Sequence, residues 1–314
     1  MRILVVGAGA LGGYFGGRLK EAGRDVTFLV RPRRAEQLAK TGLLVHSPKG
    51  DITITAPPTV LSENIRAPFD LVVLSCKAYD LQGAMDSFAP AVGPNTAILP
   101  LLNGMKHMDL LAARFGANAV LGGQCIISAT LDGDGRVLHL NDFHFVSFGE
   151  QNGAKSERVA AIAETFSGAK FDCQLSTAIL QEMWEKWAFI AAAAGICCLM
   201  RGAFGDIAAG GGSKYASDMF DECRAIAAKN GFNPGESAVK RSLGMLTAVG
   251  SPIAASMLRD IERGAPIEAD HIVGDLLARG SARPGDDPLL QLAYAHLRSY
   301  EARRQREKGA APGR

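Results

Sequence analysis

The chain has 314 residues and a mass of 33.1 kDa, about twice a typical single domain, so two domains are the first expectation. Its 34 lysines and arginines against 32 acidic residues give a net charge of +2, which excludes the broad basic surface of a nucleic-acid-binding protein. Hydrophobic residues make up 47% and charged residues 21%, a globular composition that excludes disorder as the dominant state.

Targeting segments and metal or disulfide frameworks are not expected. The apolar run at residues 1–6 is too short for a signal-peptide core or a membrane span. The most apolar stretch, Trp187–Met200, has charged residues close on both sides and is predicted to be a buried helix of a soluble protein. The six cysteines form no Cys-x-x-Cys pair, and no histidine lies at metal-ligand spacing, so neither disulfides nor a zinc site is expected. A reducing cytoplasm fits this pattern.

The first third of the chain alternates between strand-like and helix-like segments. Strands are expected at residues 2–6, 25–30, 71–75, 97–101 and 119–127, and helices at 10–22, 33–40, 81–88 and 105–114. This alternation predicts β-α-β units, and therefore an α/β fold with a doubly wound, mainly parallel sheet of the Rossmann type.

The pattern changes after about residue 130. A turn at Asp132–Gly135 leads into an antiparallel ribbon at 137–148, then a helix at 156–167 and a short strand at 171–175. From about Thr177 onward the chain is helix-patterned almost throughout. We therefore expect an NADP-binding domain at 1–175, an all-helical domain at 176–302 that contributes to substrate binding or dimerisation, and a frayed, solvated tail at 303–314.

A glycine-rich loop follows the first expected strand and opens the first helix. Its sequence is Gly7-Ala8-Gly9-Ala10-Leu11-Gly12. In this context the first glycine permits a tight turn, the second lets the backbone approach a pyrophosphate, and the third lets helix and strand pack closely. The helix N-terminus then offers free N–H groups to the phosphates. The alternative is a glycine turn that binds nothing.

The end of the second expected strand carries arginines where an NAD-binding site usually carries an acid. The segment reads Leu29-Val30-Arg31-Pro32-Arg33-Arg34. Guanidinium groups there would bind a 2′-phosphate, which favours NADPH over NADH. Alternatively, these arginines begin a solvated helix. Lys77 and Asn103 follow two later strands and would lie at the ligand-binding edge of the sheet, although either residue is equally compatible with an ordinary loop.

Two segments of the helical half interrupt their local pattern. Lys186 lies in a strongly apolar helix, where a buried ammonium is costly unless it is paired, and Glu182 one turn earlier could form a plain salt bridge with it. Ser256 and Asp260 share one face of a later helix, and Glu268 opens the next one. Composition alone favours capping or surface roles for these groups.

Taken together, these motifs resemble the ketopantoate reductase (2-dehydropantoate 2-reductase) family over nearly the whole chain. The matching segments are the loop at 7–12, C-K-A-Y at 76–79, N-G-M at 103–105, W-E-K at 184–186, S-M-L-R-D at 256–260 and I-E-A-D at 267–270. The resemblance implies a Rossmann domain, a helical C-terminal domain, and NADPH-dependent reduction of ketopantoate to pantoate in pantothenate biosynthesis.

The resemblance also implies roles for individual residues. Lys186 matches the general acid and Glu268 a second polar group of the active site, while Ser256 matches a substrate-contacting serine. Arg31, Lys77 and Asn103 match cofactor-contacting positions, with Asn103 also within reach of substrate, and Ala129 matches a backbone contact near the nicotinamide. Hydride delivery to a ketone leaves an alkoxide that needs a donor and then a proton, and a partly desolvated lysine supplies both.

The chain departs from the family pattern after the lysine. Asparagines that bind substrate in the family are replaced by Ile190 and Ala194, which predicts a more apolar site and makes a different small ketone or 2-oxo acid an alternative substrate. A third hypothesis is a sensor that binds NADPH without turnover, although such a protein needs neither Lys186 nor Glu268. A homodimer formed through the apolar helical domain is a further expectation.

Overall fold

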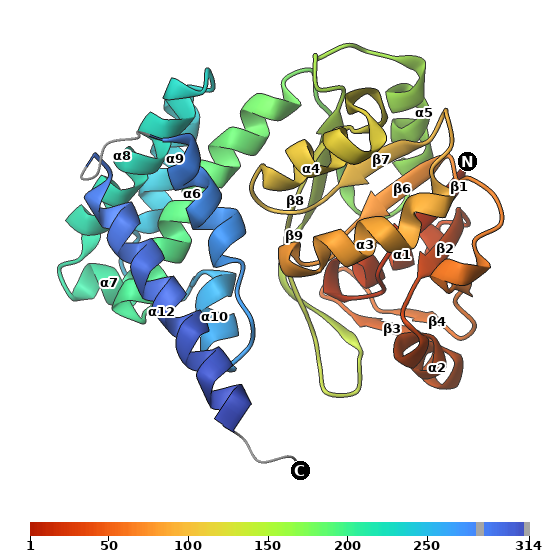
Figure 1. Cartoon of the computed structure of the whole chain (residues 1–314), viewed down its shortest axis with the longest axis horizontal. Coiled ribbons are helices and arrows are strands. Elements are labelled where there is room, and N and C mark those ends of the chain that lie inside the picture. The colour runs from red at the N-terminus through yellow and green to blue at the C-terminus, as the bar shows by residue number, and fades with distance from the viewer. Residues whose placement is uncertain (281–285, 311–314) are drawn as a thin grey trace. The chain divides into compact units, whose positions relative to one another are not determined.

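The computed structural model describes residues 1–280 and 286–310, and the chain divides into two compact units (Figure 1). The first unit comprises residues 1–102 and 107–179, and the second comprises residues 103–106 and those from 180 onward. The short segment 103–106, which carries Asn103, therefore packs with the helical unit although it follows a strand of the first.

The first unit contains a five-stranded parallel sheet with strand order β5-β2-β1-β6-β7. Its strands are β1 (Arg2–Val6), β2 (Asp25–Leu29), β5 (Thr59–Val60), β6 (Leu71–Leu74) and β7 (Ala97–Pro100). The connecting helices are α1 (Ala10–Glu21), α2 (Pro32–Thr41), α3 (Leu81–Phe88) and α4 (Lys106–Phe115). Because β1 and β6 are buried along nearly their whole length, their sequences are continuous apolar runs. The predicted α/β fold is confirmed.

The strand order of this sheet reverses between β1 and β6. β2 and β5 lie on one side of β1, and β6 and β7, which come later in the chain, lie on the other side. Val6 pairs with Leu74, so the carboxyl ends of β1 and β6 lie side by side. In open α/β sheets this switch point is where a ligand binds, and the glycine loop begins there.

A second, mixed sheet packs on α1 in the same unit. It has the order β10-β9-β3-β4, with β8 paired to β9. These strands are β3 (Leu43–His46), β4 (Ile52–Ile54), β8 (Gly122–Leu131), β9 (Val137–Gly149) and β10 (Asp172–Leu175), and α5 (Glu157–Phe166) precedes β10. The segment expected as a strand at 119–127 pairs with the parallel sheet at an isolated bridge between Val120 and Ile98, and from Gly122 onward it forms its ladder with β9. The turn at Asp132–Gly135 favours this pairing of β8 with β9, because the Asp132 carboxylate accepts hydrogen bonds from the backbone N–H groups of Asp134 and Arg136.

The second unit is helical throughout its described residues, as predicted (Figure 1). Its helices are α6 (Ile179–Met200), α7 (Phe204–Ala209), α8 (Ser213–Lys229), α9 (Glu236–Leu246), α10 (Ser256–Glu262), the π-helical turn η5 (Asp270–Gly274), α11 (Asp275–Arg279) and α12 (Pro288–Ala310). By length and composition α6 could cross a membrane, yet 67% of its most apolar window is buried, as in the core helix of a globular domain.

The tail expected to fray is helical over most of its length. Residues 303–310 continue α12, and residues 311–314 lie outside the described part of the chain. Ion pairs one turn apart explain the difference: Arg304 pairs with Glu301 at 2.9 Å, and Arg303 lies 3.6 Å from Glu307. The prediction from composition overlooked this i, i+3 and i, i+4 charge pattern.

Candidate active site

The three glycines of the loop differ in conformation and surroundings, and space is open at Gly9, the glycine expected to face a pyrophosphate. Gly7 has φ = +92° and donates its N–H to the Leu29 carbonyl at 2.9 Å, which fixes the tight turn. A Cβ on Gly12 would lie 2.0 Å from the Gly7 carbonyl oxygen, so packing alone demands a glycine there. A Cβ on Gly9 would meet nothing within 4 Å among the described residues. Internal packing therefore does not explain Gly9, and its open space is compatible with the approach of a ligand.

The N-terminus of α1 directly follows this open space. Gly9 is its N-cap residue and makes no side-chain capping bond, and the first turn contains no acidic residue. The N–H groups of Ala10, Leu11 and Gly12 are thus available to an anion, with the helix dipole favouring negative charge. This arrangement fits the pyrophosphate of a dinucleotide.

Arg31 lies beyond β2, as predicted, but an acid lies next to it. Its Nη2 is 2.8 Å from Oδ1 of Asp80, which ends the short 3₁₀ turn Ala78–Asp80 after β6. The hydrogen bond and charge of Asp80 raise the pKa of Arg31. The sequence analysis found no acid at the end of β2, because Asp80 reaches this point from another strand.

Arg34 turns its side chain toward the glycine loop. Its Nε donates to the Ala8 carbonyl at 3.1 Å, and its Nη1 donates to Gln37 at 2.7 Å. Its Nη2 is buried and meets no acceptor within the described part of the chain, and burial lowers the pKa of this guanidinium. A buried donor without an acceptor beside the loop fits an anionic oxygen of a nucleotide. In the sequence Arg34 is distinguished only as part of the arginine cluster at 31–34.

The segment after β6 also lies against the glycine loop. Ser75 donates from its hydroxyl to the Val6 carbonyl at 3.0 Å, and its Oγ would lie 2.4 Å from a Cβ on Gly12. Lys77 follows two residues later with its side chain exposed. Ala129 is partly exposed on β8, where it pairs with His139. The roles of Lys77 and Ala129 in cofactor binding remain predictions.

In the second unit, a hydrogen bond joins the segments that carry Lys186 and Glu268. The indole of Trp187 donates to the Ile272 carbonyl at 2.8 Å, and this carbonyl belongs to the π-helical turn that follows Glu268. Lys186 is partly exposed, although its neighbours Trp187 and Ala188 are fully buried. Single π-helical turns are frequent at functional sites. A salt bridge between Lys186 and Glu182 stays a prediction.

His271 was not identified from the sequence, yet it links Glu268 to the segment of Asn103. It is 6% exposed, and a Cβ on Gly104 would lie 3.1 Å from its Cδ2. Burial lowers the pKa of His271, whereas the Glu268 and Asp275 carboxylates and a hydrogen bond with the Asn103 backbone oppose that effect. The signal in the sequence was a histidine three residues after Glu268, which places both on one helix face.

The remaining predicted substrate positions differ in exposure. Ser256 is exposed at the start of α10. Ile190 lies one turn after Lys186 and is partly exposed like it, so both share a face of α6. Ala194, one turn further, is only 4% exposed. The apolar Ile190 thus lies beside Lys186, the candidate general acid, whereas Ala194 belongs to the core.

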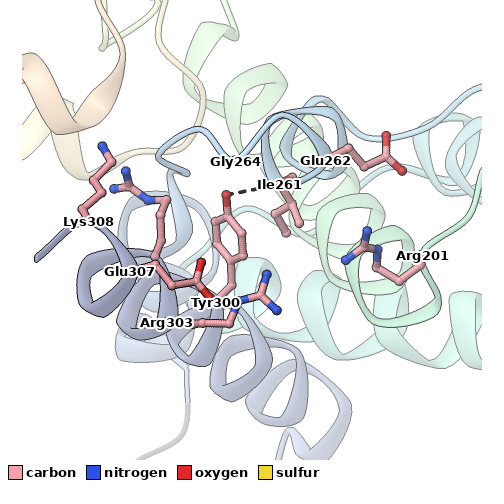
Figure 2. Close-up of a pocket in the computed structure, with 9 residues that line it drawn as sticks. Arg201, Ile261, Glu262, Gly264, Tyr300, Arg303, Glu307 and Lys308 are labelled. Atoms are coloured by element: carbon pink, nitrogen blue, oxygen red, sulfur yellow. Dashed lines mark hydrogen bonds and ion pairs between the residues drawn. The ribbon is translucent and has the colours of Figure 1, made fainter. Parts of the chain in front are cut away.

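The second unit also contains a recess whose lining includes none of these residues (Figure 2). Its lining comes from the end of α6 and from α10 and α12 and includes Arg201, Glu262, Tyr300, Arg303 and Lys308. The Tyr300 hydroxyl donates to the Ala265 carbonyl at 2.8 Å and also lies 3.5 Å from that of Ile261. Because α6 and α10 both end there, basic side chains offset the partial negative charge of the helix ends. None of the predicted catalytic or cofactor-binding residues lines this recess.

Comparison with known proteins covers both units. The family model "Ketopantoate reductase PanE/ApbA" matches residues 3–153, and its C-terminal counterpart matches residues 178–301. The uncharacterized oxidoreductase YkpB of Bacillus subtilis is 40% identical over 303 residues, which span 96% of this chain and 99% of that protein. The 2-dehydropantoate 2-reductase of Mesorhizobium japonicum is 27% identical over 97% of this chain and 99% of its own length.

Solved structures give the same result. The 2-dehydropantoate 2-reductase of Geobacter metallireducens has a TM-score of 0.85 at 30% identity, covering 95% of this chain and 99% of that one. A D-mandelate dehydrogenase, solved with NADH and anilino(oxo)acetate, has a TM-score of 0.85 at 20% identity, covers 97% and 99% of the two chains, and shows a shared fold. With both family models matched in order, the chain belongs to the ketopantoate reductase PanE/ApbA family of oxidoreductases.

Proposed function

We propose that this protein is an NADPH-dependent reductase of a 2-oxo acid, with ketopantoate as the first candidate substrate. The observation that carries the proposal is the glycine loop at the switch point of the sheet, where space is open at Gly9 and Arg34 holds a buried, unsatisfied donor. Family membership supports reduction of a small oxo acid. NADPH, when bound, supplies the hydride.

The residues of the first unit bind and orient the nucleotide in this proposal. The loop Gly7–Gly12 and the N–H groups of α1 hold the pyrophosphate. Arg34 and Arg31 supply positive charge for a 2′-phosphate, and at Arg31 the Asp80 carboxylate competes with that phosphate for the guanidinium. Lys77 and the backbone at Ala129 contribute further contacts, and so does Asn103 of the second unit.

The residues of the second unit handle the substrate and its proton. Lys186 donates a hydrogen bond to the keto oxygen and then transfers a proton from Nζ to the alkoxide. Glu268 orients this lysine or accepts a hydrogen bond from a substrate hydroxyl. Ser256 and Asn103 offer a hydroxyl and an amide to the substrate carboxylate. His271 is buried against the Asn103 segment and forms a hydrogen bond with the Asn103 backbone, so it supports the backbone that carries the amide.

A second candidate substrate follows from Ile190. An isoleucine beside Lys186 contributes no hydrogen bond to a hydroxylated acid, but it gives apolar contact to an aromatic or alkyl substituent. An apolar 2-oxo acid such as phenylglyoxylate is therefore the alternative to ketopantoate.

One experiment tests both candidates together with the sensor hypothesis. NADPH consumption is followed at 340 nm with ketopantoate, phenylglyoxylate and aliphatic 2-oxo acids, and NADPH binding is measured separately. Turnover of a 2-oxo acid at rates of about 1–10³ per second is the expected result. NADPH binding without turnover of any of these acids would instead support a sensor, and absence of NADPH binding would contradict the proposal.

A further inference from the structure

The hairpin of β8 and β9 runs along the ligand-binding edge of the parallel sheet. At its base, a Cβ on Gly123 would lie 2.6 Å from the carbonyl of Pro100, the last residue of β7. At its tip, Gln37 of α2 donates to the Asp134 carbonyl at 2.6 Å. Because α2 begins three residues after β2 ends, the hairpin extends from the carboxyl end of β7 to the neighbourhood of the carboxyl end of β2. Ligands of open α/β sheets bind along this edge.

The pairing of β8 with β9 is interrupted at Ser128, which faces the four residues 140–143. The ladder stops at the pair Ile127–His144 and resumes at the pair Ala129–His139. Within this bulge, the N–H of Ser128 donates to the side-chain oxygen of Asn141 at 3.0 Å. Bulges redirect a strand and the groups that follow it. The orientation of the backbone at Ala129 therefore depends on Asn141.

His139 holds Asn141 in place and is itself 5% exposed. Its Nε2 lies 3.1 Å from Asn141 Oδ1 and 2.9 Å from the Phe143 carbonyl. Both of these oxygens only accept, so Nε2 carries the proton. In the neutral ring Nδ1 then accepts from the hydroxyl of Ser47, which lies 2.9 Å away. This chain of hydrogen bonds has one direction, from the β3–β4 turn through the histidine to the bulge.

We infer that Asn141 and His139 are positioning residues for the nicotinamide end of the cofactor. They hold the Ser128–Ala129 backbone in the bulged conformation and so set the direction in which it presents its polar groups. The inference rests on the proposed function, in which the backbone at Ala129 contacts the cofactor near the nicotinamide. A role limited to the stability of the hairpin is the alternative.

Two variants distinguish a positioning role of Asn141 and His139 from a role limited to stability, because each removes a hydrogen bond on a different side of His139. Asn141→Ala releases the Ser128 N–H, whereas Ser47→Ala removes a hydrogen bond to the same ring and leaves the bulge closed. Both variants should lower the melting temperature. Asn141→Asp keeps an acceptor for Ser128 and for His139, and it serves as the conservative rescue.

The first measurement is single-turnover oxidation of NADPH by the 2-oxo acid that the wild-type protein reduces fastest. Asn141→Ala should slow hydride transfer roughly 10- to 100-fold, since small displacements of a reacting group have effects of that order. Its affinity for NADPH should stay close to wild type, because the glycine loop still binds the phosphates. Ser47→Ala should react at the wild-type rate, and Asn141→Asp should recover most of it.

The second measurement does not depend on turnover. The fluorescence of NADPH bound to each protein reports the environment of the reduced nicotinamide, and only Asn141→Ala should change its intensity. Equal hydride-transfer rates and equal emission for Asn141→Ala and Ser47→Ala would overturn the inference. A wild-type protein that reduces no 2-oxo acid would defeat the proposed function, while the emission comparison would still decide the role of the bulge. A wild-type protein that fails to bind NADPH would overturn both.

Discussion

Asp80 forms an ion pair with Arg31 across 49 residues of sequence, with Oδ1 and Nη2 2.8 Å apart. The two side chains are 40% and 77% exposed, so solvent screens the pair. Arg31 is the residue that the sequence predicts to bind the 2′-phosphate of NADPH. In the proposed function, the 2′-phosphate of NADPH and the Asp80 carboxylate compete for this guanidinium, and we expect that competition to influence the discrimination between NADPH and NADH.

Replacing Asp80 should strengthen the preference for NADPH. An exposed ion pair contributes about 0.2–1 kcal/mol, so Asp80→Asn should tighten NADPH binding about 1.5- to 5-fold and leave NADH unchanged. Fluorescence titrations with both cofactors measure this. Arg31→Ala is the matched control. It should weaken the binding of NADPH but not of NADH, and the loss should not exceed the contribution of a charge-assisted hydrogen bond, about 1.5–3 kcal/mol. Equal weakening of NADPH and NADH in that control would argue against the 2′-phosphate assignment.

Lys186→Ala tests the proposed general acid. Turnover should fall about 10²- to 10⁴-fold, because general acid–base catalysis contributes that much, and the affinity for NADPH should hardly change. Glu182→Ala is the control for a purely structural salt bridge. If both variants keep turnover and lose only thermal stability, Lys186 is a structural residue.

Ile190→Asn tests whether the apolar residue beside Lys186 selects the substrate. The variant should shift the ratio of kcat/KM values toward ketopantoate and away from phenylglyoxylate, since an amide replaces an apolar contact. Ala194→Asn is the stability control: this position is 4% exposed, and an unpaired amide there should cost about 1–3 kcal/mol of unfolding free energy. Fast wild-type reduction of ketopantoate with poor reduction of phenylglyoxylate would show that Ile190 did not redirect specificity.

His144 should make the first unit less stable in mild acid. Burial lowers its pKa, with His139 and Arg18 acting in the same direction and Asp172 against it, while its Nδ1 lies 2.7 Å from the Tyr14 hydroxyl. Below the unfolded-state pKa of about 6.5 the unfolded chain binds a proton that the folded chain does not, so the stabilising contribution of His144 is lost as the pH falls.

His144→Gln should flatten this dependence, because glutamine keeps an acceptor for Tyr14 but does not titrate. Urea unfolding between pH 5 and 7 measures the slope, which should decrease by at most about 1.4 kcal/mol per pH unit. An unchanged slope would mean that His144 already binds its proton in the folded protein.

Cys76 should report cofactor binding chemically. It lies between Ser75 and Lys77, next to the glycine loop, and is partly exposed. The other partly exposed thiol is Cys173, and burial raises its pKa to about 12, so it is almost entirely protonated at pH 8. Iodoacetamide should therefore modify Cys76 first, and NADPH should slow that reaction. Mass spectrometry of the labelled peptides measures it; labelling of Cys76 that is insensitive to NADPH would place the nucleotide elsewhere.

The sequence determined the parts of this protein that depend on local pattern. The apolar runs at β1 and β6, the loop Gly7–Gly12 between strand and helix, and the helical periodicity after Thr177 each follow from the residues within a few positions. Short-range chemistry decides such elements, which is why the α/β unit and the helical unit could be predicted together with the family.

The tertiary structure decided which distant residues meet. Asp80 reaches Arg31 because β6 and β2 flank β1, and His271 lies against Gly104 because the segment after β7 packs with the helical unit. Arg34 could have been a solvated helix residue until the fold placed the Ala8 carbonyl beside it. Local propensity carries no information about such pairs, since their energies arise only after packing has brought strands, loops and helix ends together.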